Sequence, residues 1–117
     1  MPATFSQGSI VWVTVPDSHG GNVKARPAVV ISGDDEIAAD GHIRVAAITT
    51  LLGRAPFSET VELPHEVEGH SVTRLKRPSE VVCSWVIRVA IDAVRDTGGR
   101  IPKEELNEIL VKVERLA

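Results

Sequence analysis

Two short apolar runs near the start of the chain, separated by a polar and glycine-rich segment, limit the possible folds more than any other feature. Residues 10–15 read IVWVTV and residues 28–31 read AVVI. Both runs predict strands, because β-branched and aromatic side chains pack well on a pleated surface. Pro16 cannot donate to a strand ladder and therefore ends the first strand. Both faces of this strand are apolar, so we expect it to be covered on two sides, as in a small closed barrel.

Further strands are predicted where apolar and polar residues alternate. They are residues 42–50, 57–63, 71–75 and 80–89. Residues 33–41 favour a loop in which a helical turn could form, and residues 90–96 fit either a helix or an extension of the preceding strand. A closing helix is predicted after Pro102 by apolar residues at helical spacing: Leu106, Ile109, Leu110, Val113 and Leu116. The pattern indicates a mainly β fold with a C-terminal helix.

The apolar runs also predict which large side chains are buried. Trp12 and Trp85 each lie within such a run, so we expect both in the core rather than on a surface that stacks nucleic-acid bases. Cys83 is the single cysteine, which excludes an internal disulfide and fits a reducing compartment. Its apolar neighbours predict a small buried thiol.

The length of 117 residues suits one domain, which we place at residues 1–117. No apolar run approaches the ~20 residues that span a bilayer. The first residues lack the basic and then apolar segments of a secretory signal. We therefore expect a cytoplasmic protein without a membrane partner.

The formal net charge of −3 argues against a broad basic coat for nucleic acid, but it leaves room for a local basic groove. Two small basic clusters are present. Arg74, Lys76 and Arg77 form one, and Lys24 and Arg26 form the other. Because Pro27 biases the preceding residue toward extended backbone, the Arg26 guanidinium has a defined direction and suits bidentate binding of a phosphate. Taken alone, the Arg-Pro pair also fits an ordinary surface arginine.

A metal site is not predicted. His65 and His70 stand five residues apart in the sequence without a matching pair of acids or thiols, and no other set of ligands has metal-binding spacing. We expect neither a metal ion nor another cofactor.

The order of motifs resembles the MazF/PemK toxin family. The segments that carry the resemblance are G-x-I-V-W-V, Pro-Asp, a glycine-rich loop, R-P-A-V-V-I-S, a strand ending in Thr-Thr, and P-K-E-E-L. They cover residues 8–50 and 101–117. The resemblance implies an SH3-like barrel of the CcdB/PemK type, a homodimer, and a cognate antitoxin peptide that binds with the toxin to DNA. It also implies metal-independent cleavage of single-stranded RNA that leaves a 2′,3′-cyclic phosphate and a 5′-hydroxyl.

The resemblance also implies roles for individual residues. Arg26 matches the arginine that binds the scissile phosphate, and Thr49 matches a threonine beside it. Thr50 takes the place of Thr49 if the strand register differs by one. His19, in the glycine-rich loop, is the candidate proton carrier. The candidate RNA-binding residues are Lys24, Thr50, Arg74, Lys76 and Arg77.

One departure from the family pattern concerns the proton acceptor. Some members have an aspartate two residues after the arginine that Arg74 matches, and this chain has Lys76 there. A lysine with an ordinary pKa is protonated at neutral pH and cannot act as a base. The alternative hypothesis is therefore a non-catalytic toxin of the gyrase-poison kind, or a degenerate toxin that serves as a protein-interaction module.

Overall fold

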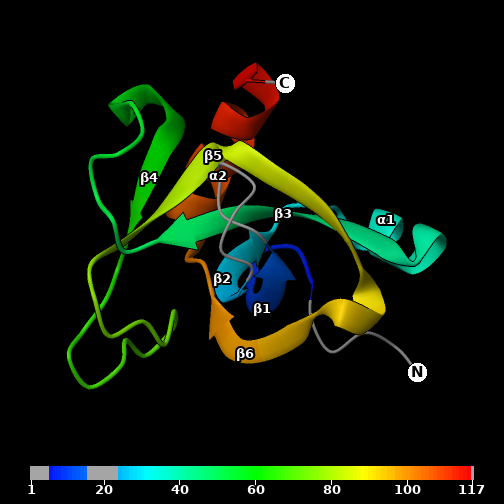
Figure 1. Ribbon diagram of the computed structural model, residues 1–117, viewed down its shortest axis with the longest axis horizontal. Coiled ribbons are helices and arrows are strands. Elements are labelled where there is room, and N and C mark those ends of the chain that lie inside the picture. The colour runs from blue at the N-terminus through cyan, green and yellow to red at the C-terminus, as the bar shows by residue number, and fades with distance from the viewer. Residues whose placement is uncertain (1–5, 16–23, 117) are drawn as a thin grey trace.

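The computed structural model describes residues 6–15 and 24–116, and Figure 1 shows the arrangement of their helices and strands. Six strands, two α-helices and two short 3₁₀ turns are formed by these residues. In chain order they are β1 (Ser9–Val15), β2 (Lys24–Val30), α1 (Asp34–Asp40), β3 (His42–Thr49), η1 (Phe57–Glu59), β4 (Thr60–Leu63), β5 (Ser79–Ala90), η2 (Ile91–Ala93), β6 (Arg95–Arg100) and α2 (Lys103–Leu116).

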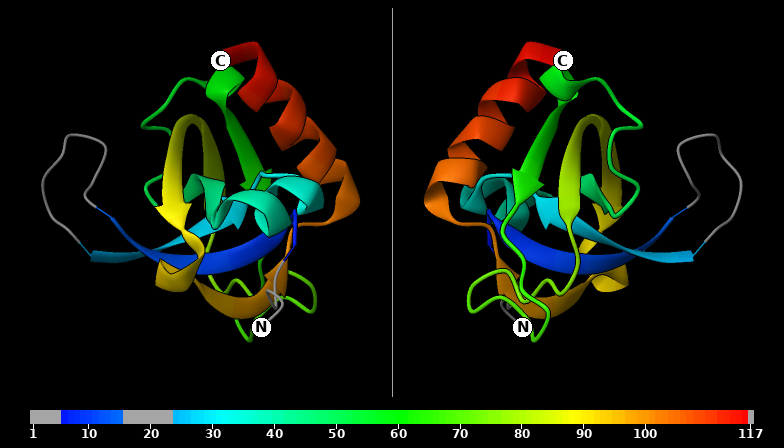
Figure 2. Two further views of the ribbon diagram at one scale, coloured as in Figure 1. Left: turned by 90° about the vertical axis from the view of Figure 1, so that its right-hand side faces the viewer. Right: turned by 90° about the vertical axis from the view of Figure 1, so that its left-hand side faces the viewer.

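The strands form one antiparallel sheet in the order β4-β5-β3-β2-β1-β6. The sheet curls into a half-barrel, and in the part of the chain that the structure describes β4 and β6 do not pair to close it. This architecture confirms the predicted mainly β fold with a C-terminal helix. Helix α2 lies along one side of the sheet, beside β4 and β5 (Figure 2).

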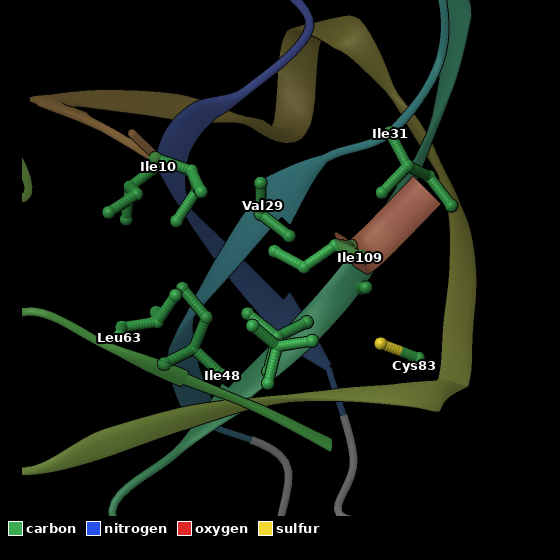
Figure 3. Packing of buried hydrophobic residues seen from close by; sticks show 11 residues of the cluster. Ile10, Val29, Ile31, Ile48, Leu63, Cys83 and Ile109 are labelled. Atoms are coloured by element: carbon green, nitrogen blue, oxygen red, sulfur yellow. The ribbon is translucent and has the colours of Figure 1, made fainter. Parts of the chain in front are cut away.

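Apolar side chains are buried on both faces of the sheet. The helix-side cluster comprises Ile10, Val29, Ile31, Ala46, Ile48, Val61, Leu63, Val81, Cys83, Ile101 and Ile109, and α2 covers it with Leu106, Leu110 and Val113. Figure 3 shows Ile109 reaching from α2 toward Val29. The opposite cluster comprises Val11, Val13, Ala28, Val30, Ile37, Ile43 and Val45. The central strands are therefore covered on both sides, as their continuous apolar runs predict.

The strand predicted at residues 71–75 is wrong, because the segment satisfies its hydrogen bonds inside a loop. The Leu75 carbonyl accepts from the backbone N–H groups of Glu66 and His70, both at 3.1 Å. The buried Thr73 hydroxyl donates to the Pro64 carbonyl at 2.8 Å and accepts from the Leu75 N–H at 3.1 Å. One further bond leaves the loop, because the Val72 carbonyl accepts from the Arg100 N–H of β6 at 2.9 Å, but the segment forms no strand ladder.

Other element boundaries also differ from the prediction. Residues 57–59 form the 3₁₀ turn η1, so only Thr60–Leu63 of the predicted strand pairs with β5. Residues 90–96 are neither a helix nor a simple extension of β5, because η2 interrupts them before β6 begins at Arg95. Strand β6 contains two adjacent glycines, and a Cβ added at Gly99 would collide with the Thr73 carbonyl oxygen. The 64–78 loop therefore packs closely on β6.

The two tryptophans are not core residues. Trp12 is 45% exposed, because the helix-side cluster stops at Ile10 on this strand. Trp85 is partly exposed, and its ring lies 5.6 Å from the guanidinium carbon of Arg26. Cys83, by contrast, is 1% exposed, which confirms the predicted buried thiol. Among the residues described, no helix has the length and apolar character needed to cross a membrane.

We expect Ile109→Ala to destabilise the protein by roughly 2–5 kcal/mol, because it leaves a cavity in the helix-side cluster. Val111→Ala is the matched control on the same helix, since Val111 is 54% exposed and should change the free energy of unfolding by less than about 0.5 kcal/mol. Urea denaturation measures both values. Equal effects of the two substitutions would contradict the described packing of α2.

The Cys83 thiol should resist alkylation in the folded protein. Burial raises its pKa from the ordinary 9.0 to about 11, and the nearby Lys112 ammonium opposes that rise only in part. Because the unfolded thiol loses its proton first, the free energy of unfolding should fall as the pH rises from about 9 toward 11. Thiol titration at pH 8, with and without denaturant, tests the burial. Cys83→Ala should remove this part of the pH dependence of the free energy of unfolding. Rapid labelling of the thiol in the native protein would contradict the burial of Cys83.

Candidate functional site

Arg26 lies in β2 at the point where the two-sided apolar run ends. It pairs with Val13 of β1, and Pro27 follows it in the strand. Its guanidinium carbon lies 5.6 Å from the centroid of the Trp85 ring on β5. A cation over an indole face at this distance is attracted by the ring quadrupole. The Arg26 side chain is partly buried, so the ring and the strand together give the guanidinium a fixed place.

The register of the sheet brings Thr49 to the same place. The β2–β3 ladder pairs Ala28 with Ala47 and Val30 with Val45, and the same register continued along both strands places Arg26 opposite Thr49. Opposed residues of antiparallel strands project from the same face. The Thr49 hydroxyl oxygen accepts from the Leu51 N–H at 3.0 Å, which leaves its proton available for a donor bond. Thr50 lies exposed just beyond the end of β3.

Glu80 belongs to the same group of side chains, and sequence reasoning missed it. It pairs with Thr49 across the β3–β5 ladder and is only 5% exposed. One carboxylate oxygen, Oε1, accepts from the Gly53 N–H at 3.3 Å and so attaches the loop after β3 to β5. In the sequence, Glu80 is marked only as a glutamate directly before an apolar run. The pairing of β3 with β5 is what shows that it lies beside Thr49.

Trp85 reaches Arg26 because β5 contains an irregularity. The ladder shifts between Ala46↔Val86 and Ile48↔Val81, so Ala47 alone lies opposite residues 82–85. Val81 and Cys83 face the helix-side cluster before the shift, whereas Ile87 packs against the opposite cluster after it. A bulge of this kind redirects side chains and is common beside functional sites. Periodicity along the sequence gave no sign of it, since the run from 80 to 89 reads as one regular strand.

Lys24, the first residue of β2, is exposed two positions before Arg26 and so extends the basic surface along that strand. Arg74 lies elsewhere. It has a left-handed backbone with φ of 65°, and its guanidinium lies beside Gly98 of β6. The neighbouring Thr97 hydroxyl donates to the Ile10 carbonyl at 2.7 Å. Arg74 is therefore close to the Ile10 end of β1, roughly 10 Å along that strand from Val13, which is the partner of Arg26.

Lys76 and Arg77 are exposed in the same 64–78 loop as Arg74. RNA binding by these three residues stays a prediction. It would require an RNA long enough to extend from Arg26 to the 64–78 loop. His19 lies outside the residues that the structure describes. The loop histidine His70 has a local role, because its Nδ1 accepts from the N–H groups of Val72 and Thr73 at 3.1 and 3.2 Å. No cluster of three or more potential metal ligands occurs among the described residues.

A pocket of about 380 Å³, whose lining does not include Arg26, lies between α2 and the η1–β4 segment. Its lining includes four glutamates and one lysine: Glu62, Glu104, Glu105, Glu108 and Lys112. Lys112 donates to the Thr60 carbonyl at 2.8 Å and stands 3.9 Å from Glu108. This excess of carboxylates repels a phosphate, so we place the candidate anion site at Arg26 and not in the pocket.

The group at Arg26 can hold a phosphate and assist a reaction at phosphorus. A guanidinium supplies donors for two phosphate oxygens, a threonine hydroxyl supplies one more, and the aromatic ring restricts the cation to one position. Such preorganised donors stabilise negative charge that develops in a transition state.

Several solved structures share the fold at low sequence identity. MazF from Deinococcus radiodurans superposes with a TM-score of 0.73 and 18% identity, covering 96% of this chain and 94% of that one. A mycobacterial endoribonuclease in complex with its cognate antitoxin gives 0.73 at 14% identity, covering 97% and 94%. The toxin MazF-mt6 from Mycobacterium tuberculosis gives 0.67 at 18% identity, covering 92% and 94%. At these identities the likeness shows the fold alone. Among proteins of curated function, none matches the chain by sequence.

The sequence profile of one protein family covers almost the whole chain. The profile is described as PemK-like, MazF-like toxin of type II toxin-antitoxin system, and it matches residues 6–116. This range includes the strand that carries Arg26, the strand that ends at Thr49, and the closing helix α2. The chain therefore belongs to the PemK/MazF family of toxins of type II toxin–antitoxin systems.

Proposed function

We propose that this toxin is a metal-independent endoribonuclease of single-stranded RNA, formed by one domain over residues 1–117 and acting in the cytoplasm. The observation that carries the proposal is the Arg26 guanidinium over the Trp85 ring, at 5.6 Å from its centroid. Thr49 supports it, because the β2–β3 register would set Thr49 opposite Arg26 if it continued two positions beyond Ala28↔Ala47. Family membership supports the same reaction class.

In the proposed reaction the ribose 2′-oxygen attacks the adjacent phosphorus and the bond from phosphorus to the 5′-oxygen breaks. The products are a 2′,3′-cyclic phosphate and a 5′-hydroxyl, so the 2′-hydroxyl proton passes to a base and one proton reaches the leaving oxygen. Arg26 binds the non-bridging oxygens and stabilises their added charge, and Thr49 donates to one of them. His19 is the candidate proton carrier.

Glu80 is assigned a positioning role in this reaction. Its burial and its bond to the Gly53 N–H at 3.3 Å hold the loop that follows Thr49. The proposed proton carrier is therefore His19, in place of the aspartate that some family members have at the position of Lys76.

Two partners follow from the proposal. A cognate antitoxin is supported by the family and by the solved mycobacterial complex of similar fold. The loop that follows Thr49 offers it exposed apolar side chains, Leu51 and Leu52. We further propose that the toxin is a homodimer and that its complex with the antitoxin binds DNA.

Arg26→Ala should lower the rate of RNA cleavage by roughly 100- to 1,000-fold, because the transition-state charge loses its principal donor. The assay uses purified protein, mixed-sequence single-stranded RNA and excess chelator, with mapping of 5′-hydroxyl ends. Arg115→Ala, an exposed change in the last turn of α2, is the control and should leave the rate unchanged. The same pair is compared for growth arrest in cells.

Undiminished cleavage by Arg26→Ala would overturn the assignment of this site. Absence of cleavage by the unaltered protein, together with a co-purified protein target, would favour the non-catalytic gyrase-poison class instead.

Glu80→Gln should keep the cleavage rate within about threefold, because the amide oxygen still accepts from the Gly53 N–H, whereas Glu80→Ala should lower it about tenfold. Glu62→Gln, on the exposed partner position of β4, is the control. Rates are measured from pH 5 to 9 on each variant. Equal losses in Glu80→Gln and Glu80→Ala, with disappearance of one limb of the pH profile, would show that Glu80 transfers a proton instead.

A further inference from the structure

We infer that Trp85 stacks a base of the RNA next to the scissile phosphate, in addition to holding Arg26, and that it contributes affinity without selecting the base. This inference rests on the proposed function and adds an RNA contact to the Arg26 site. It reverses the expectation, drawn from the sequence, that both tryptophans are core residues.

The first step of the argument is position. The Trp85 ring lies 5.6 Å from the guanidinium carbon that would bind the phosphate. The base of a nucleotide is joined to its phosphate through the ribose, so a base next to the scissile phosphate is within reach of an aromatic ring beside Arg26. Trp85 keeps part of its surface exposed.

The second step is the direction of the side chain. A regular β5 would continue the alternation of Val81 and Cys83 and would turn the residue at 85 into the helix-side cluster. The shift in the β3–β5 ladder prevents this, because residues 82–85 stand opposite Ala47 alone. The cluster under α2 resumes with Val86. The irregularity therefore removes the largest side chain of β5 from the core and places it beside Arg26.

The third step is chemistry. Aromatic rings and arginine planes stack the bases of single-stranded RNA, and every base has a π-face, so such a contact tolerates any sequence. Arg26 and Trp85 together form one such surface. Trp12, the other tryptophan, pairs with Pro27 and lies on the opposite face from Val13, the residue that faces Arg26. It provides a matched control on the neighbouring strand.

The test uses the fact that the chain has two tryptophans. Trp12→Phe leaves Trp85 as the sole indole, and Trp85→Phe leaves Trp12. Each variant is titrated with a labelled, mixed-sequence RNA carrying 2′-O-methyl groups, which removes the attacking hydroxyl. Label anisotropy reports binding and indole emission reports stacking. In Trp12→Phe we expect the RNA to quench the indole emission to saturation, with the same midpoint as the anisotropy titration. In Trp85→Phe we expect the indole emission to change little.

A second variant measures the contribution to affinity. Trp85→Leu should weaken binding of the same RNA by roughly 5- to 150-fold, whereas Trp85→Phe should retain it within a few-fold. RNA binding without quenching of Trp85 would overturn the inference and leave the proposed nuclease intact. If the protein neither binds this RNA nor cleaves unmodified RNA, the proposed function is overturned, and the inference is overturned with it.

Discussion

Burial of β2 and β3 on both faces is the constraint on which the rest of the structure depends. Val29 and Val30 of β2 are inaccessible to solvent, as are Val45 and Ala46 of β3, so neighbouring residues enter opposite clusters. A slip of one residue between such strands would still bury apolar groups on each side. The register is instead fixed by where the apolar runs stop, because a shifted pairing would draw the Arg26 guanidinium into the core at high cost.

The same constraint explains where the candidate site lies. Polar groups gather at the end of the central strands, where Arg26, Thr49 and Glu80 follow or precede buried residues. A buried carboxylate and a partly buried cation are tolerated there because each has a defined contact, Gly53 for Glu80 and the Trp85 ring for Arg26. The site is thus built on strands and not on loops, which gives its groups more exact positions.

The sequence allows the central part of this arrangement to be predicted. Continuous β-branched runs identify β1 and β2, and the apolar stripe of α2 identifies the helix that covers one face. The Arg-Pro pair and the Thr-Thr strand end were available as candidates because a motif can be read without knowing the fold. Their chemical roles stay predictions, and their proximity is inferred by extending the β2–β3 register beyond the pair Ala28↔Ala47.

The parts that could not be predicted depend on contacts between distant segments. The 64–78 loop resembles a strand locally, but Thr73 and Pro64 satisfy each other's polar groups. The sequence of β6 predicts a turn because of Gly98 and Gly99, yet the segment forms a strand because it pairs with β1. The bulge that redirects Trp85, and the burial of Glu80 beside Thr49, both arise from pairing with β3. No periodicity within β5 encodes them.

The pairing of β1 with β6 has a consequence for how the protein is made. Ser9 is opposite Arg100, so one edge of the sheet joins segments that the ribosome synthesises far apart in time. Closing so large a loop carries a high entropic cost and slows folding. Helix α2 follows β6 directly, and Ile109 fills the core from it. A nascent chain whose last quarter has not yet left the ribosome therefore cannot complete the sheet, so the native arrangement of strands forms only when synthesis is nearly finished.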